Sequence, residues 1–206
     1  MGTIRQVIYF LKQRKDDKIM QDMAQFLTSA VDSMLDMTQE LLDFSRGKSS
    51  VELSPIALAD LLQELDIQIL RRLPDENIEV VRSIEYEGEF VGDLSRLTRL
   101  YANIIKNAAE AMKNGGTLTL TAKEDAGNLV FEISDTGCGI PPEITNKLFE
   151  PFVTHGKSNG TGLGMSIAKS VVEAHQGSIQ VESEIGKGTT FFIRIPLDLT
   201  PGVVSG

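Results

Sequence analysis

Two asparagines separated by one helical turn are residues whose type and spacing could do chemistry. Asn103 and Asn107 lie four positions apart in a stretch with a helical pattern, so their side chains share one face. Carboxamide oxygens suit Mg²⁺, which keeps most of its water and takes few protein ligands when phosphates supply the rest. Two asparagines on a helix are also common surface residues, so the pair alone is weak evidence for a metal site.

Two glycine-containing segments could bring the backbone close to a ligand. Residues 135–139 (Asp-Thr-Gly-Cys-Gly) follow a predicted strand, and the carboxylate could accept a hydrogen bond from an exocyclic amine. Residues 160–164 (Gly-Thr-Gly-Leu-Gly) open a helix, whose free N–H groups and positive end could bind phosphate. Neither segment is a Walker A sequence or a G-x-G-x-x-G motif after a strand. Taken singly, the first could be a simple turn and the second a flexible helix start.

Alternating strand and helix patterns must position these segments. Asp93 is a candidate helix N-cap, and the glycines at 115 and 116 mark the end of that helix. We expect strands near 51–53, 78–86, 117–123, 129–134, 178–184 and 189–195, and helices over 58–70, 93–113, 142–149 and 162–175. This order predicts an α+β domain with one antiparallel or mixed sheet covered on one face by helices.

The N-terminal residues have a heptad pattern instead, and a polar stretch at 47–50 separates them from the rest. Between Lys18 and Arg46, apolar residues recur at alternating spacings of three and four: Met20, Met23, Leu27, Ala30, Met34, Met37, Leu41 and Phe44. A shorter stripe precedes a charged turn at 12–18, which predicts an antiparallel helical hairpin. Pairing of two hairpins in a homodimeric four-helix bundle would cover the seam. Docking of the stripe on the chain's own C-terminal domain is the alternative.

Composition excludes several classes of protein. The 206 residues are 41% hydrophobic and 24% charged with a net charge of −9, which argues against a nonspecific nucleic-acid surface. Apolar runs are too short to span a bilayer. One cysteine, Cys138, allows no intrachain disulfide, and with two histidines it cannot build a Cys/His zinc site. We expect no nucleic-acid partner, no membrane contact by this chain and a cytoplasmic location.

In series, the motifs resemble the N, G1, F and G2 boxes of the histidine kinase ATP-binding domain. Asn-x-x-x-Asn is followed by Asp-x-Gly-x-Gly, by Phe-Glu-Pro-Phe at 149–152 and by Gly-Thr-Gly-Leu-Gly. Residues 186–191 look like the closing strand of that family, and residues 41–46 are similar to the second helix of its dimerisation domain. The resemblance implies a dimerisation and phosphotransfer hairpin over 1–47, an α/β-sandwich ATP-binding domain over 51–198 and a C-terminal tail over 199–206.

The resemblance also implies roles for individual residues. Asn107 would bind Mg²⁺, Asn103 would support it from one turn earlier, and Asp135 would accept from the adenine amino group. Lys157, in a mobile lid over 151–160, could neutralise γ-phosphate charge or could be an ordinary solvated lysine. Further ATP-binding residues would be Gly137 and Gly139 beside the base, Phe152 as the hydrophobic anchor of the lid, Gly160, Thr161, Gly162, Leu163 and Gly164 at the phosphates, and Thr189 at the adenine pocket.

Position 103 helps to separate function classes. Gyrase- and MutL-type ATPases, which share this fold family, generally have a Glu there, whereas an Asn is no general base for hydrolysis. The resemblance therefore implies a protein-histidine kinase that passes the γ-phosphoryl of Mg-ATP to a His and then to an Asp of a response-regulator receiver domain. The alternatives are a nucleotide-binding regulatory or scaffold dimer without autokinase activity, and an ATP-hydrolysing or serine kinase relative.

The chain departs from the family pattern at the phosphoacceptor. Residues 1–50 contain no histidine, and we expect His155 and His175 to be solvated or structural. The second helix of the hairpin would be about 43 Å long and the first about 20 Å. Either the end of the longer helix stands free or about 15 residues of the first helix are missing, and we favour a missing segment. Residues 1–5 also resemble the segment directly after the family's His-Glu-x-x-Asn-Pro stretch. We therefore expect either a chain cut within its first helix or a homologue whose start was assigned at an internal Met. In both cases we expect the acceptor roughly half a dozen residues before Met1, and no autophosphorylation by this chain alone.

Overall fold

The computed structural model describes residues 38, 51–71, 73, 77–153 and 162–198. Along the chain it contains β1 (Ser54–Ala57), α3 (Leu58–Gln68), β2 (Ile78–Ile84), β3 (Glu89–Gly92), α4 (Leu94–Ala111), β4 (Gly116–Asp125), β5 (Asn128–Asp135), α5 (Pro142–Thr145), α6 (Gly164–Ala174), β6 (Ser178–Glu184) and β7 (Gly188–Pro196). The predicted hairpin over 1–47 and the tail over 199–206 lie outside the described residues.

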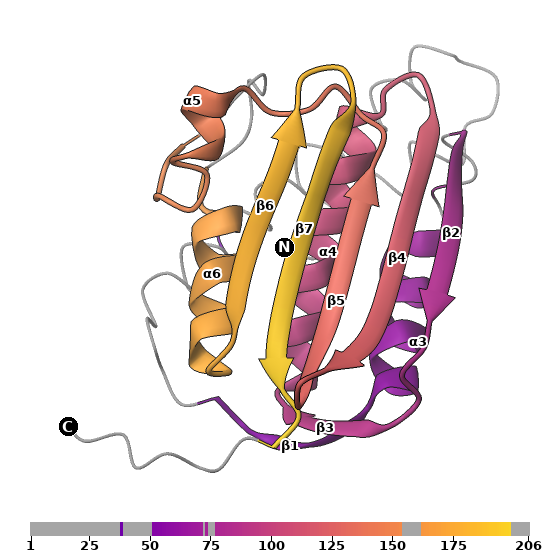
Figure 1. Ribbon diagram of the computed structural model, residues 1–206, viewed down its shortest axis with the longest axis vertical. Helices are drawn as coiled ribbons and strands as arrows, with labels where there is room; N and C mark the ends of the chain where they lie inside the picture. The colour runs from indigo at the N-terminus through magenta and orange to yellow at the C-terminus, as the bar shows by residue number, and fades with distance from the viewer. Residues whose placement is uncertain (1–37, 39–50, 72, 74–76, 154–161, 199–206) are drawn as a thin grey trace, which may run out of the picture.

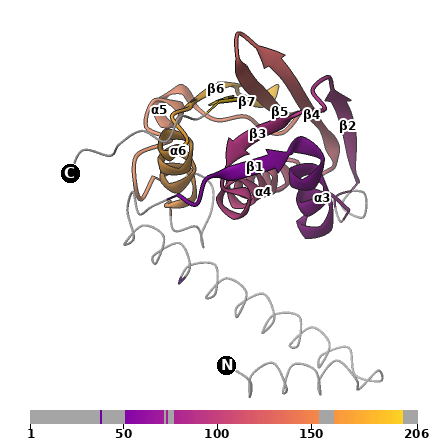
Figure 2. The same cartoon turned by 90° about the horizontal axis from the view of Figure 1, so that it is seen from below.

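Five strands form the main sheet in the order β2-β4-β5-β7-β6. The β2–β4 pair is parallel, and the other three pairs are antiparallel. Helices α3, α4 and α6 lie behind this sheet in Figure 1, and the view from below shows them on the same side of it (Figure 2). The predicted α+β architecture, with one mixed sheet covered on one face, is confirmed.

Two short elements differ from the prediction. The strand expected at 51–53 is wrong, because the first strand is β1 at Ser54–Ala57. β1 pairs antiparallel with β3 in a separate two-stranded sheet. No strand was expected at β3, whose four residues pair with β1 over a long sequence separation. The helix expected over 142–149 is also too long, since α5 ends at Thr145 and turns follow it. The remaining helix and strand boundaries agree with the prediction to within two residues.

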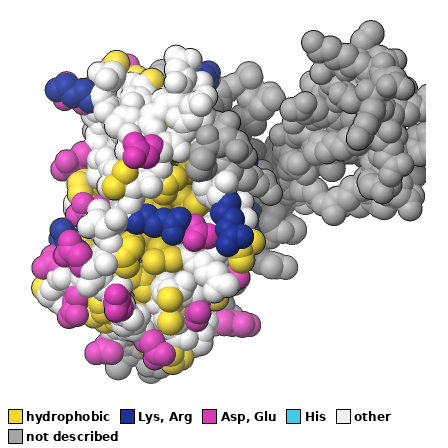
Figure 3. Space-filling model, turned by 90° about the vertical axis from the view of Figure 1, so that its right-hand side faces the viewer, with side chains coloured by type: hydrophobic (Ala, Val, Ile, Leu, Met, Phe, Trp, Pro, Cys, Tyr) yellow, Lys and Arg dark blue, Asp and Glu magenta, His cyan; other side chains and the backbone are white. Residues whose placement is uncertain are grey.

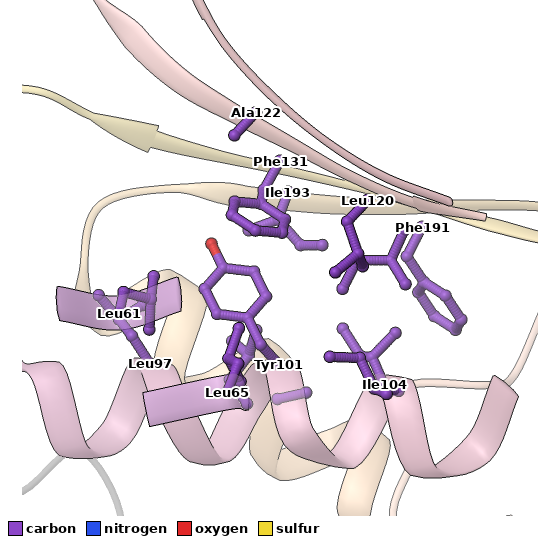
Figure 4. Packing of buried hydrophobic residues seen from close by; sticks show 14 of the residues in the cluster. Leu61, Leu65, Leu97, Tyr101, Ile104, Leu120, Ala122, Phe131, Phe191 and Ile193 are labelled. Atoms are coloured by element: carbon purple, nitrogen blue, oxygen red, sulfur yellow. The ribbon is translucent and has the colours of Figure 1, made fainter. Parts of the chain in front are cut away.

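Helix α4 is the centre of the domain and is capped as expected. Its N-cap Asp93 accepts a hydrogen bond from the backbone N–H of Arg96 at 3.1 Å. One side of the helix packs against the sheet, with the Tyr101 ring 4.5 Å from the Phe131 ring between centroids (Figure 4). Buried residues on this side are Leu97, Leu100, Tyr101, Ile104, Ile105 and Ala108. Full burial of each large apolar side chain stabilises the fold by about 1.5–3 kcal/mol, so these contacts together strongly favour this position of α4 on the sheet.

The edge formed by β2 and α3 faces the viewer in Figure 3, where apolar and charged side chains are mixed. Arg82 of β2 forms an ion pair with Asp66 of α3 across this edge. Beside it, Ile67 is 52% exposed and Val81 is 40% exposed. A charged residue on an edge strand opposes pairing with another chain.

In the part of the chain that the structure describes, no helix is long and apolar enough to cross a membrane.

His175 joins the end of α6 to the start of α4. The imidazole is fully buried, with Nδ1 2.7 Å from the carbonyl oxygen of Val171 and Nε2 2.9 Å from the backbone nitrogen of Asp93. Because a carbonyl only accepts and an N–H only donates, the ring is neutral with its proton on Nδ1. The expectation that His175 is a structural residue is confirmed.

Acidification should therefore weaken the fold through His175. Burial lowers the pKa of this imidazole below 6.5, opposed by its bond to Val171 and by the Asp93 carboxylate, while the Arg96 charge lowers it further. The unfolded state then binds more protons than the folded state, so stability falls as the pH drops below about 6.5. We expect the free energy of unfolding in urea to fall more between about pH 7 and pH 5 in the wild type than in His175→Gln. Equal pH dependence would contradict this prediction. His155 is present in both proteins and cancels in the comparison.

Candidate functional site

A row of three polar side chains crosses the helix-covered face of the sheet near the end of β5. Asp135 of β5 pairs with Thr189 of β7, and Thr189 pairs with Ser183 of β6. Side chains of directly paired residues project to the same face. The next row along the same three strands is apolar and consists of Ile133, Phe191 and Val181. The polar row therefore lies next to the hydrophobic core, in which Ile133 and Phe191 are buried and against which Val181 packs.

Asp135 is a buried carboxylate whose bonds come from backbone N–H groups. The residue is 6% exposed, and Oδ1 accepts from the N–H of Gly137 at 2.8 Å. Burial raises the pKa of this carboxyl, and hydrogen bonds from the backbone N–H groups of Gly137 and Thr189 partly oppose the rise. Among the described residues, no lysine or arginine forms an ion pair with it. Such a carboxylate is costly to bury, and it is suited to accept hydrogen bonds from a ligand.

The glycines after Asp135 are needed for the chain to pack against itself. A Cβ on Gly137 would lie 2.7 Å from the Cβ of Ala111, and one on Gly139, where φ is +72°, would lie 2.2 Å from the carbonyl oxygen of Glu184. Between them, the N–H of Cys138 donates to the carbonyl of Ala111 at 3.2 Å. The loop is thus held between the end of α4 and the β6–β7 turn. Room for a base, which the sequence suggested, is not the only reason for glycine here.

Asn103 and Asn107 are half-buried on α4, which also carries Ala111. Asn107 precedes Ala111 by one helical turn, about 6 Å along the axis. The same helix therefore brings the amide pair and the 137–139 loop to one end of the sheet. Two amide oxygens with few other protein ligands fit Mg²⁺ that is held mainly by phosphates and water.

The two ends of the predicted lid meet before α6. Phe152 donates from its backbone N–H to the carbonyl of Gly162 at 2.9 Å, and a Cβ on Gly162 would lie 2.5 Å from the carbonyl carbon of Phe152. Leu163 is buried and Gly164 begins α6. The Phe152 side chain is 67% exposed, so its ring is not packed into the core as an anchor would be. Lys157, Gly160 and Thr161 lie outside the described residues.

A cleft of about 450 Å³ lies beside the polar row at the end of α4. Residues 110–115, residues 136–138 and Gly186 line it. Cys138 has a free and exposed thiol at this cleft. Asp135 and Thr189 are not among its lining residues, so the cleft adjoins the polar row through the 136–138 loop only.

Ser183 is a residue of this site that the sequence did not predict. It lies in β6, where alternation of polar and apolar residues indicates a strand but not its neighbours. Its inclusion follows from the register in which it faces Thr189. A pattern within one strand carries no information about that register.

Residues 92–199 match the family model described as "Histidine kinase-, DNA gyrase B-, and HSP90-like ATPase". The signal transduction histidine-protein kinase AtoS of Escherichia coli K12 is 29% identical over 200 residues, which cover 96% of this chain and 33% of AtoS. The sensor protein SrrB of Staphylococcus aureus MRSA252 is 35% identical over 171 residues, which cover 78% of this chain and 29% of SrrB. The chain thus spans about a third of the length of these relatives.

Solved structures with the same fold include two longer histidine kinases. Full-length ShkA in complex with AMPPNP has a TM-score of 0.75 at 24% identity, covering 97% of this chain and 44% of ShkA. The histidine kinase ThkA in complex with the response regulator protein TrrA has a TM-score of 0.71 at 22% identity, covering 96% of this chain and 57% of ThkA. At these identities the likeness establishes the fold.

Proposed function

Because the chain belongs to the histidine kinase-, DNA gyrase B- and HSP90-like ATPase family, we propose that it is the ATP-binding catalytic part of a two-component sensor histidine kinase. The observation that carries the proposal is the buried Asp135 carboxylate, which lies next to the apolar core and is held by backbone N–H groups. An acceptor in that position suits the amino group of adenine. Thr189, paired with Asp135, would complete the polar end of the base site.

The remaining motifs would then hold the triphosphate. Asn107 would bind Mg²⁺ through its amide oxygen, with Asn103 in support one turn earlier. The segment from Gly162 to Gly164 would direct N–H groups at the start of α6 towards phosphate oxygens. Lys157 would add positive charge near the γ-phosphate. When bound, Mg²⁺ neutralises charge on the phosphoryl oxygens during transfer.

We propose a protein histidine, not water, as the first phosphoryl acceptor. Asn103 carries an amide, which cannot activate water as a general base. His175 is buried with both ring nitrogens hydrogen-bonded, so it is not available as the acceptor. Residues 1–50 contain no histidine, so the acceptor in our proposal is a histidine outside residues 1–50 and other than His175. From there the phosphoryl group would pass to an Asp of a response regulator, and ThkA, solved with TrrA, is a precedent of the same fold.

Other parts of the proposal concern organisation. Residues 1–47 would form the dimerisation hairpin of a homodimer, residues 51–198 the ATP-binding domain and residues 199–206 a tail. The catalytic part would work in the cytoplasm, where ATP and response regulators are present.

The test incubates the full product of the gene with γ-labelled ATP and Mg²⁺. We expect an acid-labile, alkali-stable label on the protein, its transfer to a receiver domain, and its absence in EDTA. Binding of ATP without any label would replace the kinase proposal by the regulatory dimer. One observation favours that second candidate: residues 1–50 contain no histidine. Steady phosphate release without label would instead identify an ATP-hydrolysing enzyme.

A further inference from the structure

We infer that Ser183 is a positioning residue that makes the base site select purines with an amino group at position 6. It acts by orienting the hydroxyl of Thr189 as a hydrogen-bond acceptor. The inference rests on the proposed function and extends it, since Ser183 belongs to none of the sequence motifs assigned to nucleotide binding.

Three polar groups surround the Ser183 hydroxyl. Its Oγ lies 2.8 Å from the backbone nitrogen of Ile140, 3.0 Å from the carbonyl oxygen of Gly188 and 2.9 Å from Oγ1 of Thr189. Ile140 follows the glycine loop that starts at Asp135, and Gly188 begins β7. Ser183 therefore connects the loop, the start of β7 and the polar row through one oxygen atom.

Hydrogen-bond chemistry determines the direction of each contact. A hydroxyl has one hydrogen to donate and two lone pairs to accept with. The Ile140 N–H can only donate, so Ser183 accepts from it, and the Gly188 carbonyl can only accept, so Ser183 donates to it. The assignment that satisfies all three contacts has the Thr189 hydroxyl donating to the second lone pair of Ser183.

Thr189 is consequently left as an acceptor towards the ligand. Its hydrogen is used by Ser183, and among the residues that the structure describes no other side chain is within hydrogen-bond distance of its hydroxyl. Thr189 is 5% exposed and pairs directly with Asp135, so two acceptors stand side by side. A 6-amino group can donate to this pair, whereas a 6-oxo group presents a third acceptor and is disfavoured.

Close contacts limit how far this arrangement can relax. Gly188 has φ of +118°, and a Cβ there would lie 1.9 Å from the carbonyl oxygen of Asp135. The starts of β7 and of the glycine loop are therefore tightly apposed, and Ser183 pairs with Thr189 of β7 and accepts from the Ile140 N–H after the loop. Without the Ser183 hydroxyl, the backbone would stay in place while the Thr189 hydroxyl gained freedom to rotate. Thr189 could then donate to a 6-oxo group.

The test compares the dissociation constants of ATP and inosine triphosphate for the 206-residue chain. Inosine carries a 6-oxo group and a proton on N1, where adenosine carries a 6-amino group and an unprotonated N1. We expect Ser183→Ala to lower the ratio of the inosine to the adenosine value by about tenfold, the size of one hydrogen bond. Ser183→Thr, which keeps the hydroxyl, should restore the ratio. Ser178→Ala, on the same strand but on the exposed face, is the matched control and should leave the ratio unchanged.

A double-mutant cycle with Thr189→Val separates positioning from general damage. If Ser183 acts through Thr189, then Ser183→Ala should not change the ratio further in the Thr189→Val background. Three results together would overturn the inference and leave Ser183 a structural residue. Ser183→Ala would weaken the binding of both nucleotides equally, its effect would add to that of Thr189→Val, and its melting temperature would be lower than that of the wild type. Failure of the wild-type chain to bind either nucleotide would instead count against the proposed function. Should Ser183→Ala not fold, an unchanged ratio in Thr189→Val alone would overturn the inference.

Discussion

Replacing Asn107 by alanine is expected to reduce phosphoryl transfer from ATP by at least about 100-fold in the full product of the gene. A metal ion that stabilises charge on a phosphoryl group contributes several kcal/mol to the transition state, and each 1.36 kcal/mol corresponds to a factor of ten in rate. Alanine maintains the helix but removes the amide oxygen proposed to hold Mg²⁺. The measurement is the initial rate of incorporation of label from γ-labelled ATP.

Affinity measurements should show that this loss is specific to the metal. In EDTA, the affinity of Asn107→Ala for ADP should remain within about threefold of wild type, because the base site at Asp135 is intact. Asn128→Ala is the matched control. This amide lies at the end of β5 away from Asp135 and donates to the turn carbonyls of Asp125 and Ala126. Full activity of Asn107→Ala in Mg²⁺ would refute the assignment of this residue as the metal ligand.

Replacing Asp135 by asparagine is expected to weaken ATP binding by about 30- to 100-fold without lowering the stability of the fold at neutral pH. A hydrogen bond to a charged group is worth about 1.5–3 kcal/mol. Asparagine can keep its amide oxygen on the Gly137 N–H, but its NH₂ would then face the amino group of adenine, where the carboxylate accepts. Burial raises the pKa of the native carboxyl more than its N–H bonds lower it. The ionised form is therefore less favourable in the folded than in the unfolded protein, and a neutral isostere avoids that cost.

The stability of the two proteins should also depend differently on pH. With its pKa raised in the folded state, Asp135 binds a proton more readily when folded, so its unfavourable contribution shrinks as the pH falls through that raised pKa and is gone below the ordinary pKa of an aspartate. Calorimetric titration with ATP and urea unfolding at neutral and acidic pH measure the two effects. Asp125→Asn, in a half-exposed ion pair with Arg194 at the other end of the sheet, should leave ATP affinity unchanged. If Asp135→Asn is less stable than the wild type and binds ATP with the same affinity, both expectations are wrong.

Local signals determined most of the secondary structure. The period of apolar residues and the Asp93 cap were enough to place α4 within two residues, because helix formation depends on contacts three and four positions apart. Strands β4 and β5 were likewise predicted from the alternation of apolar and polar residues at 117–123 and 129–134. β1 and β3 were misplaced or missed because each is four residues long and exists through pairing with the other. Nothing within either segment specifies that distant partner.

The site divides in the same way. Residue types and their order in the chain predicted Asp135, the amide pair on α4 and the glycine loops as candidate site residues, since an acceptor, metal ligands and close backbone approach each require particular side chains. Tertiary structure decided that Asp135 is buried and that Thr189 and Ser183 lie beside it in one row. It also decided that Gly139 must be glycine because of the Glu184 carbonyl. Strand register and contacts between distant segments set these features, and both depend on how the entire sheet and its helices pack.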